Sequence, residues 1–351
     1  MTAGVQTRGM IFGDKAPPRK SGPPSGDRDA LVIGLVNNMP DAEVENTEKQ
    51  FRHLLGLASC GLPVRLRLLA LPEVPRSEAG RAQIQERYED ISTLADEEID
   101  GLIVTGTEPR ARSLREEPFS PALARLVDWA EEHTRSTIWS CLAAHAAVLY
   151  LDGIERHPFV DKLSGVFECE KHADHPLVAG RLSRWFVPHS RHNGLAEDEL
   201  ASRGYRTLLR SPEIGPGMFE RQGRSLFLFV QGHPEYDRHA LHREYRRDVG
   251  RFLRGRSDRY PEIPRGYFDA LTMGVLAGFR AHALRNRCPE LIADFPAIRD
   301  AAIIESWSAA AVEFYRGWLT HLYAERTRCR LTTSHARNAS RAAVARVAGI
   351  A

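Results

Sequence analysis

Two short segments of the sequence combine residue types that could carry out nucleophilic catalysis. In the first, an apolar run at residues 137–140 leads directly into Cys141, and an alanine-rich stretch that favours a helix follows. A cysteine at such a strand-to-helix turn projects its sulfur from the edge of a sheet, and the free amides of the helix stabilise a thiolate. The alternative is a buried core cysteine, which is the common fate of a free thiol.

The second segment is Gly232-His233-Pro234-Glu235, which follows an apolar run at residues 225–230. Pro234 favours an extended backbone at His233, and residues two apart in an extended segment face the same side. His233 and Glu235 can therefore lie together, so that the carboxylate fixes the imidazole tautomer and stabilises its cation. Among 14 histidines this spacing can arise by chance, but together with the cysteine it predicts a Cys-His-Glu triad.

A thiolate nucleophile also needs backbone amides directed at the oxyanion that forms on the attacked carbonyl. The N–H of Leu142 is one expected donor, because Leu142 directly follows the nucleophile. The turn Thr105-Gly106-Thr107 could supply the second donor from Thr107. The alternative for this turn is a tight bend that needs glycine for backbone reasons alone.

The elements that must position these residues follow an alternating pattern. Apolar runs predict strands, and amphipathic segments between them predict helices at residues 41–58, 79–95 and 118–132; the strands are expected at residues 31–36, 64–71, 101–105 and 137–140. This alternation predicts an α/β fold with a mostly parallel, doubly wound sheet and helices on both faces. Short apolar runs between residues 163 and 230 predict added strands, some of them antiparallel. Ligands of such sheets bind at the carboxyl ends of the strands, where Cys141 is expected.

The same patterns divide the chain into four parts. We expect a flexible leader at residues 1–28, a catalytic domain at 29–255, a helical extension packed on it at 256–325, and a basic flexible tail at 326–351. The leader is rich in Gly, Pro and Ser, and the tail has six arginines and no acidic residue. An alternative for the tail is a contact with nucleic acid or a protein partner.

Composition excludes several classes of protein. The 351 residues include 48 Lys and Arg against 46 Asp and Glu, and 42% are hydrophobic, which is typical of a folded globular chain. The small net charge gives no reason to expect nucleic acid or a membrane as partner. No apolar run is long enough for a membrane span, and the N-terminal segment 1–29 is polar and carries no apolar core of a signal peptide. We therefore expect a cytoplasmic protein. Five widely spaced cysteines without a CxxC pair argue against a disulfide framework or a metal site.

Six segments resemble the homoserine O-acyltransferases of the homoserine O-succinyltransferase family. They occur in unbroken order over about residues 30 to 255: LVNNMP at 35–40, GLIVTG at 101–106, the cysteine turn at 141, KLSGV at 162–166, PHSR at 188–191 and GHPEYD at 232–237. Six ordered motifs are far more specific than any one of them. The resemblance implies a class I glutamine amidotransferase-like fold.

Carried over position by position, the resemblance implies a role for each of six residues. Cys141 would be the acyl-thioester nucleophile, His233 the proton acceptor and Glu235 its partner; the implied substrate contacts are Lys162, Ser190 and Arg247. Without the resemblance, Lys162 and Arg247 would be interpreted as surface charges. The implied reaction transfers an acyl group from acyl-CoA, a co-substrate, to homoserine for methionine biosynthesis, in a homodimer that has no bound cofactor.

The sequence departs from the family pattern at several positions. His145 replaces a more usual Gln, Leu142 replaces a frequent Trp, and Arg110 stands where the family distinguishes acyl donors by Gly or Glu. A guanidinium could bind the free carboxylate of a succinyl group through two hydrogen bonds, so Arg110 favours succinyl-CoA. In the alternative, Arg110 turns outward and contacts the phosphates of coenzyme A.

Other functions stay open at this level. The donor could be acetyl-CoA, and the acceptor could be serine or another hydroxy amino acid. A glutamine amidotransferase or a related hydrolase would use the same triad. An inactive regulatory protein that binds nucleic acid through its basic tail is a third possibility.

Overall fold

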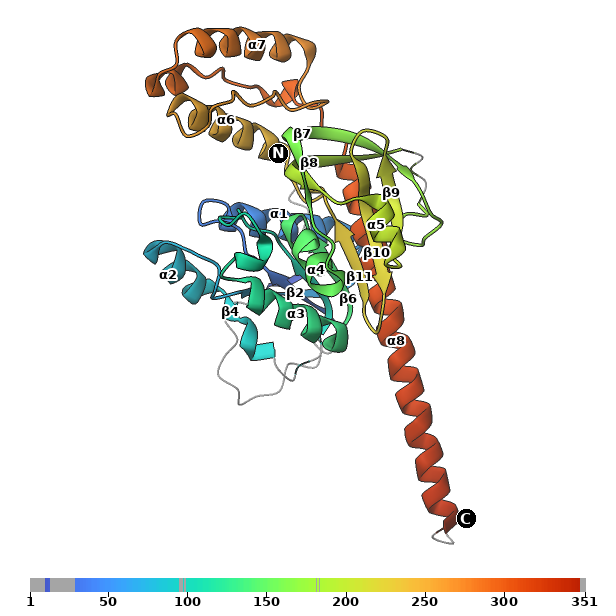
Figure 1. Cartoon of the computed structure of the whole chain (residues 1–351). Coiled ribbons are helices and arrows are strands. Elements are labelled where there is room, and N and C mark those ends of the chain that lie inside the picture. The colour runs from blue at the N-terminus through green and yellow to red at the C-terminus, as the bar shows by residue number, and fades with distance from the viewer. Residues whose placement is uncertain are drawn as a thin grey trace, which may run out of the picture.

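A computed structural model describes residues 10–12, 29–94, 97, 99–180, 182 and 184–347. Most of the expected leader therefore lies outside the described residues. Figure 1 shows an α/β body, a helical lobe beside it, and one long helix that runs across the body and continues past it.

The parallel part of the sheet carries the predicted catalytic cysteine. Its central strands lie in the order β3-β2-β5-β6-β11, and all of these neighbours are parallel. Their bounds are β2 Leu31–Val36, β3 Val64–Ala70, β5 Ile99–Val104, β6 Thr134–Ser140 and β11 Leu226–Val230. Two short strands, β1 Met10–Phe12 and β4 Glu89–Asp90, both pair with β3. The α/β prediction with a mostly parallel sheet is confirmed.

An antiparallel extension continues the sheet beyond β11. The order is β11-β10-β9-β7-β8, and each of these pairs is antiparallel. The bounds are β7 His157–Lys171, β8 Trp185–Gly194, β9 Arg206–Ser211 and β10 Gly215–Gln222. The prediction of added antiparallel strands is therefore confirmed, although β7 and β8 are much longer than their apolar runs.

Helices cover both faces of the parallel strands. Helices α3 (Ser120–His133) and α4 (Leu142–Asp152) share one apolar core with Leu102 and Val104 of β5. On the opposite face, α1 (Val44–Ala58) and α8 (Ser308–Val347) share a second core with Ile103. The alternation of buried side chains along β5 thus joins the two layers.

The helical lobe has a core of its own. Helices α6 (Ala240–Leu253) and α7 (Ala270–Arg285) pack there with Val166 of β7. The remaining short helices are α2 Glu78–Arg87, α5 Glu197–Ser202, η1 Ile91–Leu94, η2 Leu114–Glu116, η3 Pro289–Asp294 and η4 Asp300–Ala302. No helix among the described residues is long and apolar enough to span a membrane.

The structure corrects several boundaries. The expected flexible tail from Arg326 is helical as far as Val347, because the segment contains no Gly or Pro and is rich in the helix formers Ala and Arg. Within the expected leader, Met10–Phe12 form β1 instead of a loose segment, because β3 offers them an open sheet edge. The helix expected at residues 79–95 already ends at Arg87, where Tyr88 adopts an extended backbone.

Candidate active site

Cys141 lies at the turn between β6 and α4, as the sequence predicts. Its backbone has φ 50° and ψ −113°, a conformation that costs a non-glycine residue about 1 to 3 kcal/mol and often occurs at catalytic residues. The Cys141 N–H donates to the Val230 carbonyl at 2.7 Å, which ties the turn to the end of β11. The thiol remains partly exposed at the N-terminus of α4.

His233 and Glu235 lie next to this cysteine, just after β11. The Nδ1 atom of His233 is 2.8 Å from Glu235 Oε1, and both side chains are buried. The His233 N–H donates to the Pro188 carbonyl of β8 at 2.7 Å. This close approach requires Gly232, because a Cβ there would lie 2.5 Å from the Val187 side chain.

Electrostatic contacts favour a protonated His233. Burial alone lowers the pKa of this imidazole, but the adjacent Cys141 and Glu235 outweigh burial and raise the pKa well above its usual value of 6.5. Both partners also form side-chain hydrogen bonds with the ring. Tyr236 stacks on it with ring centroids 4.3 Å apart. Because Glu235 occupies Nδ1, the Nε2 atom is left to face the thiol.

The expected oxyanion donors lie at the same rim. Leu142 is the first residue of α4, and the loop that contains Thr107 packs directly against it. A Cβ at Gly106 would lie 2.8 Å from the Leu142 Cβ and 2.9 Å from its backbone nitrogen. Because Gly106 has no side chain, this loop can approach the backbone amide of Leu142 closely. Leu142 and Thr107 both line the cavity in front of Cys141.

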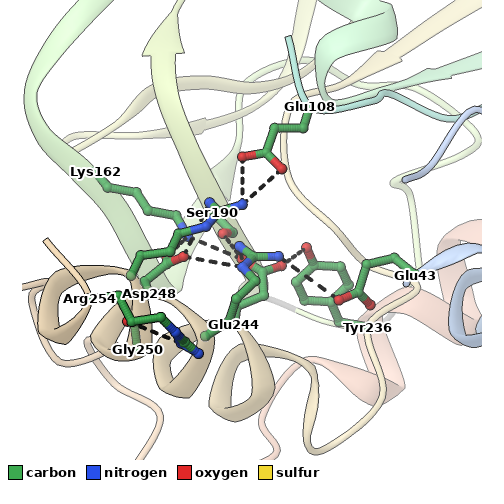
Figure 2. Close-up of polar contacts among 11 residues, drawn as sticks. Glu43, Glu108, Lys162, Ser190, Tyr236, Glu244, Asp248, Gly250 and Arg254 are labelled. Atoms are coloured by element: carbon green, nitrogen blue, oxygen red, sulfur yellow. Dashed lines mark hydrogen bonds and ion pairs between the residues drawn. The ribbon is translucent and has the colours of Figure 1, made fainter. Parts of the chain in front are cut away.

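A cavity of about 650 Å³ opens in front of the triad, and Lys162, Ser190 and Arg247 all line it. They converge on Glu244 of α6, as Figure 2 shows for Lys162 and Ser190. Lys162 Nζ is 3.2 Å from Glu244 Oε2 and 2.6 Å from Asp248 Oδ2. The structure thus brings the three expected substrate contacts together on one wall.

Four carboxylates and three cations form a network on this wall. Arg247 lies 3.6 Å from Glu244, 3.2 Å from Asp248 and 3.9 Å from Glu43. The network extends to Glu108 through Arg251, at 2.8 Å. Burial would raise the pKa of Glu244, but Lys162, Arg247 and hydrogen bonds from Ser190 and Tyr236 lower it to about 2. This carboxylate is therefore charged at any physiological pH.

A second set of buried polar side chains beside the cavity is neutral or lacks an acidic partner. His145 Nε2 donates a hydrogen bond to Gln231 Oε1 at 2.9 Å, and burial lowers the pKa of His145 to about 3. Burial likewise lowers the pKa of Arg191 to about 10. The Arg191 guanidinium bonds to His189 at 3.2 Å, to Gln231 at 3.1 Å and to two backbone carbonyls.

Arg110, which was expected to determine the choice of acyl donor, does not line the cavity. The Glu117 carboxylate accepts the backbone N–H groups of Arg110 and Ala111, at 2.5 and 2.6 Å, and this holds the loop in place. The exposed Arg110 guanidinium then reaches the Pro75 carbonyl at 3.4 Å instead of the cavity. Glu108 and Pro109 of the same loop line the cavity in its place.

Sequence reasoning missed Glu244 and Asp248, although a signal for them existed. Residues 244, 247, 248 and 251 follow one another at helical spacing and alternate in charge, so they share one face of α6. That pattern is also typical of a solvated helix surface. The contact with Lys162 shows that this face of α6 is part of the cavity wall and not a solvated surface. Lys162 lies in β7, more than 80 residues away in sequence.

The remaining candidates for metal binding or thiol reactivity are the other acidic, histidine and cysteine side chains. Among the described residues, no group of three or more His, Cys, Asp or Glu side chains is placed to hold a metal ion. Cys169 is buried, which raises the pKa of its thiol to about 12, and Cys60, Cys288 and Cys329 are exposed.

The chain is similar to a known protein family, to individual relatives and to solved structures. The family model described as homoserine O-succinyltransferase matches residues 20–329. A homoserine O-succinyltransferase of Rhodopseudomonas palustris is 51% identical over 307 residues, which are 86% of this chain and 92% of the relative. A protein with the same description from Bradyrhizobium japonicum is 46% identical over 306 residues, or 86% and 94%. Among solved structures, a glutamine amidotransferase of Thermotoga maritima aligns with a TM-score of 0.46 and 12% identity, over 84% of this chain and 98% of that one.

Proposed function

The chain belongs to the homoserine O-succinyltransferase family, and from this premise we propose that it transfers the succinyl group of succinyl-CoA to the hydroxyl of L-homoserine. The product, O-succinylhomoserine, would enter methionine biosynthesis. The single observation that carries the proposal is the Cys141-His233-Glu235 triad at the rim of a cavity whose wall presents both signs of charge.

In the first step, the Cys141 thiolate attacks the thioester carbonyl of succinyl-CoA. The new S–C bond gives a tetrahedral oxyanion, which the Leu142 and Thr107 amides would stabilise. The C–S bond to coenzyme A then breaks, and protonated His233 gives its proton to the leaving thiolate. The enzyme is left as a succinyl thioester on Cys141 with a neutral imidazole.

In the second step, His233 Nε2 accepts the proton of the homoserine hydroxyl while the hydroxyl oxygen attacks the carbonyl carbon of the Cys141 thioester. The O–C bond forms, the S–C bond breaks, and the Cys141 thiolate is restored beside an imidazolium. Glu235 holds the ring in the tautomer that both steps need. The cavity provides positioning, which is the other main contribution to acyl transfer.

The charged wall supports recognition of a zwitterionic amino acid. Arg247 and Lys162 offer cations to the α-carboxylate of homoserine, and Glu244 offers a permanently charged carboxylate to the α-ammonium group. These residues also pair with one another, so that each buried charge has a partner of opposite sign. Ser190, which donates to Glu244, would help to orient that carboxylate.

The test is to follow release of free coenzyme A from succinyl-CoA or acetyl-CoA, each with homoserine or serine. We expect turnover chiefly with succinyl-CoA and homoserine. Mass spectrometry without acceptor should show one succinyl group on the wild type and none on Cys141→Ala. A Cys141→Ala variant that turns over at the normal rate would rule the covalent scheme out. Turnover only with acetyl-CoA or serine would change the substrate assignment but not the chemistry.

The rival functions have tests of the same kind. Glutaminase activity without acyl-CoA consumption would favour an amidotransferase-type hydrolase. A Cys141 inert toward iodoacetamide, together with salt-sensitive DNA binding, would favour a regulatory protein. We further propose a symmetric homodimer as the working form, which sedimentation velocity at micromolar concentration tests directly.

A further inference from the structure

The cations that line the cavity differ in what balances their charge. Lys162, Arg247 and Arg251 each lie within ion-pair distance of carboxylates on α6 or in the neighbouring loops. Arg191 is buried, but its guanidinium is occupied by Gln231, His189 and backbone carbonyls. Each of these four side chains thus already has an ion-pair or hydrogen-bond partner.

Arg156 is different. It lies in the short connection between α4 and β7, it is half-buried, and it lines the same cavity as Cys141. Over the part of the chain that the structure describes, no ion pair or side-chain hydrogen bond engages its guanidinium. A partly desolvated guanidinium of this kind has its hydrogen-bond donors available, and Arg is the side chain best suited to bind a carboxylate through two parallel bonds.

The electrostatics agree with this position. Burial lowers the pKa of Arg156, and Glu117, Glu155 and Cys141 only partly oppose that effect. Of these, Glu117 already accepts two backbone N–H groups from the loop at residues 110–111. Arg156 also acts on His145, one turn into α4, where it lowers the pKa of the imidazole after burial and Arg191. Arg156 is therefore close to both Cys141 and the first turn of the elbow helix.

An acyl group on Cys141 would extend from this point into the cavity. A succinyl thioester carries its free carboxylate two methylene groups beyond the reacting carbonyl, whereas an acetyl thioester ends in a methyl group. A cation near the nucleophile that has no ion pair of its own could bind this carboxylate without breaking an existing contact. Arg110, which the sequence suggested for this purpose, points away toward Pro75.

We propose that Arg156 binds the free carboxylate of the succinyl group and thereby selects succinyl-CoA over acetyl-CoA. This inference rests on the proposed function, since it assigns the acyl subsite of the same reaction. Arg156 contacts the part of the donor that does not react. Its effect should therefore appear as a difference between donors and not as a general loss of activity.

The experiment compares three donors with homoserine as acceptor: succinyl-CoA, acetyl-CoA, and succinamoyl-CoA, in which an amide replaces the free carboxylate. For Arg156→Met we expect kcat/KM with succinyl-CoA to fall about 10- to 100-fold, the usual range for a lost charge-assisted pair. With acetyl-CoA and succinamoyl-CoA it should stay within about threefold of the wild type, because these donors lack the carboxylate.

Two further variants make the result interpretable. Arg256→Met removes an exposed cation from the same cavity and should affect all three donors alike. Arg156→Lys retains the charge without the planar fork and should show an intermediate preference; it also carries the test if Arg156→Met does not fold, which circular dichroism will show.

The outcomes separate the two proposals. An equal loss with all three donors, or an unchanged preference for succinyl-CoA in both Arg156 variants, would overturn the role of Arg156 alone. A wild-type enzyme that releases no coenzyme A with any donor would overturn the proposed function, and the acyl subsite with it.

Discussion

His233 has to be an acid in one half of the proposed cycle and a base in the other. Before acylation, the Cys141 thiolate and Glu235 keep the ring protonated, so a proton is ready for the departing coenzyme A. In the proposed cycle, acylation would remove the negative charge of Cys141, so that Glu235 alone would oppose the effect of burial, which lowers the pKa of His233. The neutral ring that results is the form that can accept the hydroxyl proton. In the proposed cycle, formation of the thioester would thus change which protonation state of the imidazole is favoured.

Replacing Glu235 by Gln tests this account. Without the carboxylate, burial should dominate more strongly and the pKa of His233 should fall, so the ring loses its proton at a lower pH than in the wild type. An NMR titration of the imidazole Cε1–H measures this shift. We expect kcat to fall about 10²- to 10⁴-fold, because tautomer control and charge stabilisation are both lost. An unchanged His233 titration would show that Glu235 is not its electrostatic partner.

Replacing Glu244 by Gln tests recognition of the acceptor separately. The variant loses the carboxylate proposed for the α-ammonium group, and Lys162 and Arg247 are left with Asp248. We expect KM for homoserine to rise about 10-fold or more, and KM for succinyl-CoA to stay nearly unchanged. Asp161→Asn is a matched control, since this carboxylate also lines the cavity but pairs with the exposed Arg259. Equal changes for both substrates would argue against the assignment.

A site residue could be predicted from the sequence where its position depends on neighbouring residues in the chain, and could not where it depends on distant ones. Cys141 and His233-x-Glu235 lie at the ends of apolar strands, so short-range sequence patterns were sufficient to identify them. The side-chain direction of Arg110 depends on Glu117, whose carboxylate fixes the loop from seven residues away. The pairing of Lys162 with Glu244 and Asp248 depends on β7 meeting α6, which no local pattern records.

At the scale of elements, the loop after β5 must approach the N-terminus of α4 without steric conflict. Gly106 makes this approach possible, because a side chain there would meet the Cβ and the amide nitrogen of Leu142. The two expected oxyanion donors sit on the two sides of this contact. Their spacing should therefore be sensitive to one added methyl group.

Gly106→Ala is the corresponding prediction. The added Cβ must push the loop away from α4, so we expect kcat to fall about 10²-fold, in line with the loss of one oxyanion donor, while the fold persists. Gly274→Ala is the matched control, because a Cβ at this position in α7 meets nothing within 4 Å. The control should keep full activity and gain about 0.5 to 1 kcal/mol in urea unfolding. Full activity of Gly106→Ala would show that this loop takes no part in catalysis.

Element boundaries were predictable where one face of an element is buried throughout. The runs at 31–36 and 225–230 are buried almost continuously; the observed β2 matches the first, and β11 begins one residue after the start of the second. β7 is different, because its first five residues are exposed, although Phe159 and Val160 among them are apolar, and its pairing with β8 is interrupted between Pro158 and Leu163. Hydrophobic periodicity detects burial, so it missed strand residues that are held mainly by backbone hydrogen bonds.

At the scale of the whole molecule, α8 links the C-terminal part of the chain to the residues that precede β2. Arg326 is buried in the body, and its guanidinium donates to the Ala30 carbonyl at 2.7 Å and lies 3.4 Å from Asp100. Figure 1 shows that the helix then continues beyond the sheet toward the C-terminus. The composition of residues 326–351 suggested a free tail, but its first residue is part of the core. Only the contact with Asp29 and Ala30, almost 300 residues earlier, reveals this.

The helix should therefore contribute unequally to stability along its length. Trp318 is fully buried, its Nε1 donates to Ser136 Oγ at 3.0 Å, and it packs over Gly101 of β5. Trp318→Ala opens a large void against the strand next to the catalytic turn and leaves the Ser136 hydroxyl without this donor. We expect a loss of about 3 to 5 kcal/mol in the free energy of unfolding, measured by circular dichroism in urea.

Truncation after Thr332 retains Trp318 and Arg326, so it should change stability by less than about 1 kcal/mol and leave kcat unchanged. If the truncation proves as damaging as Trp318→Ala, the far end of α8 must be anchored in the working protein, and a partner subunit would be the first candidate to examine.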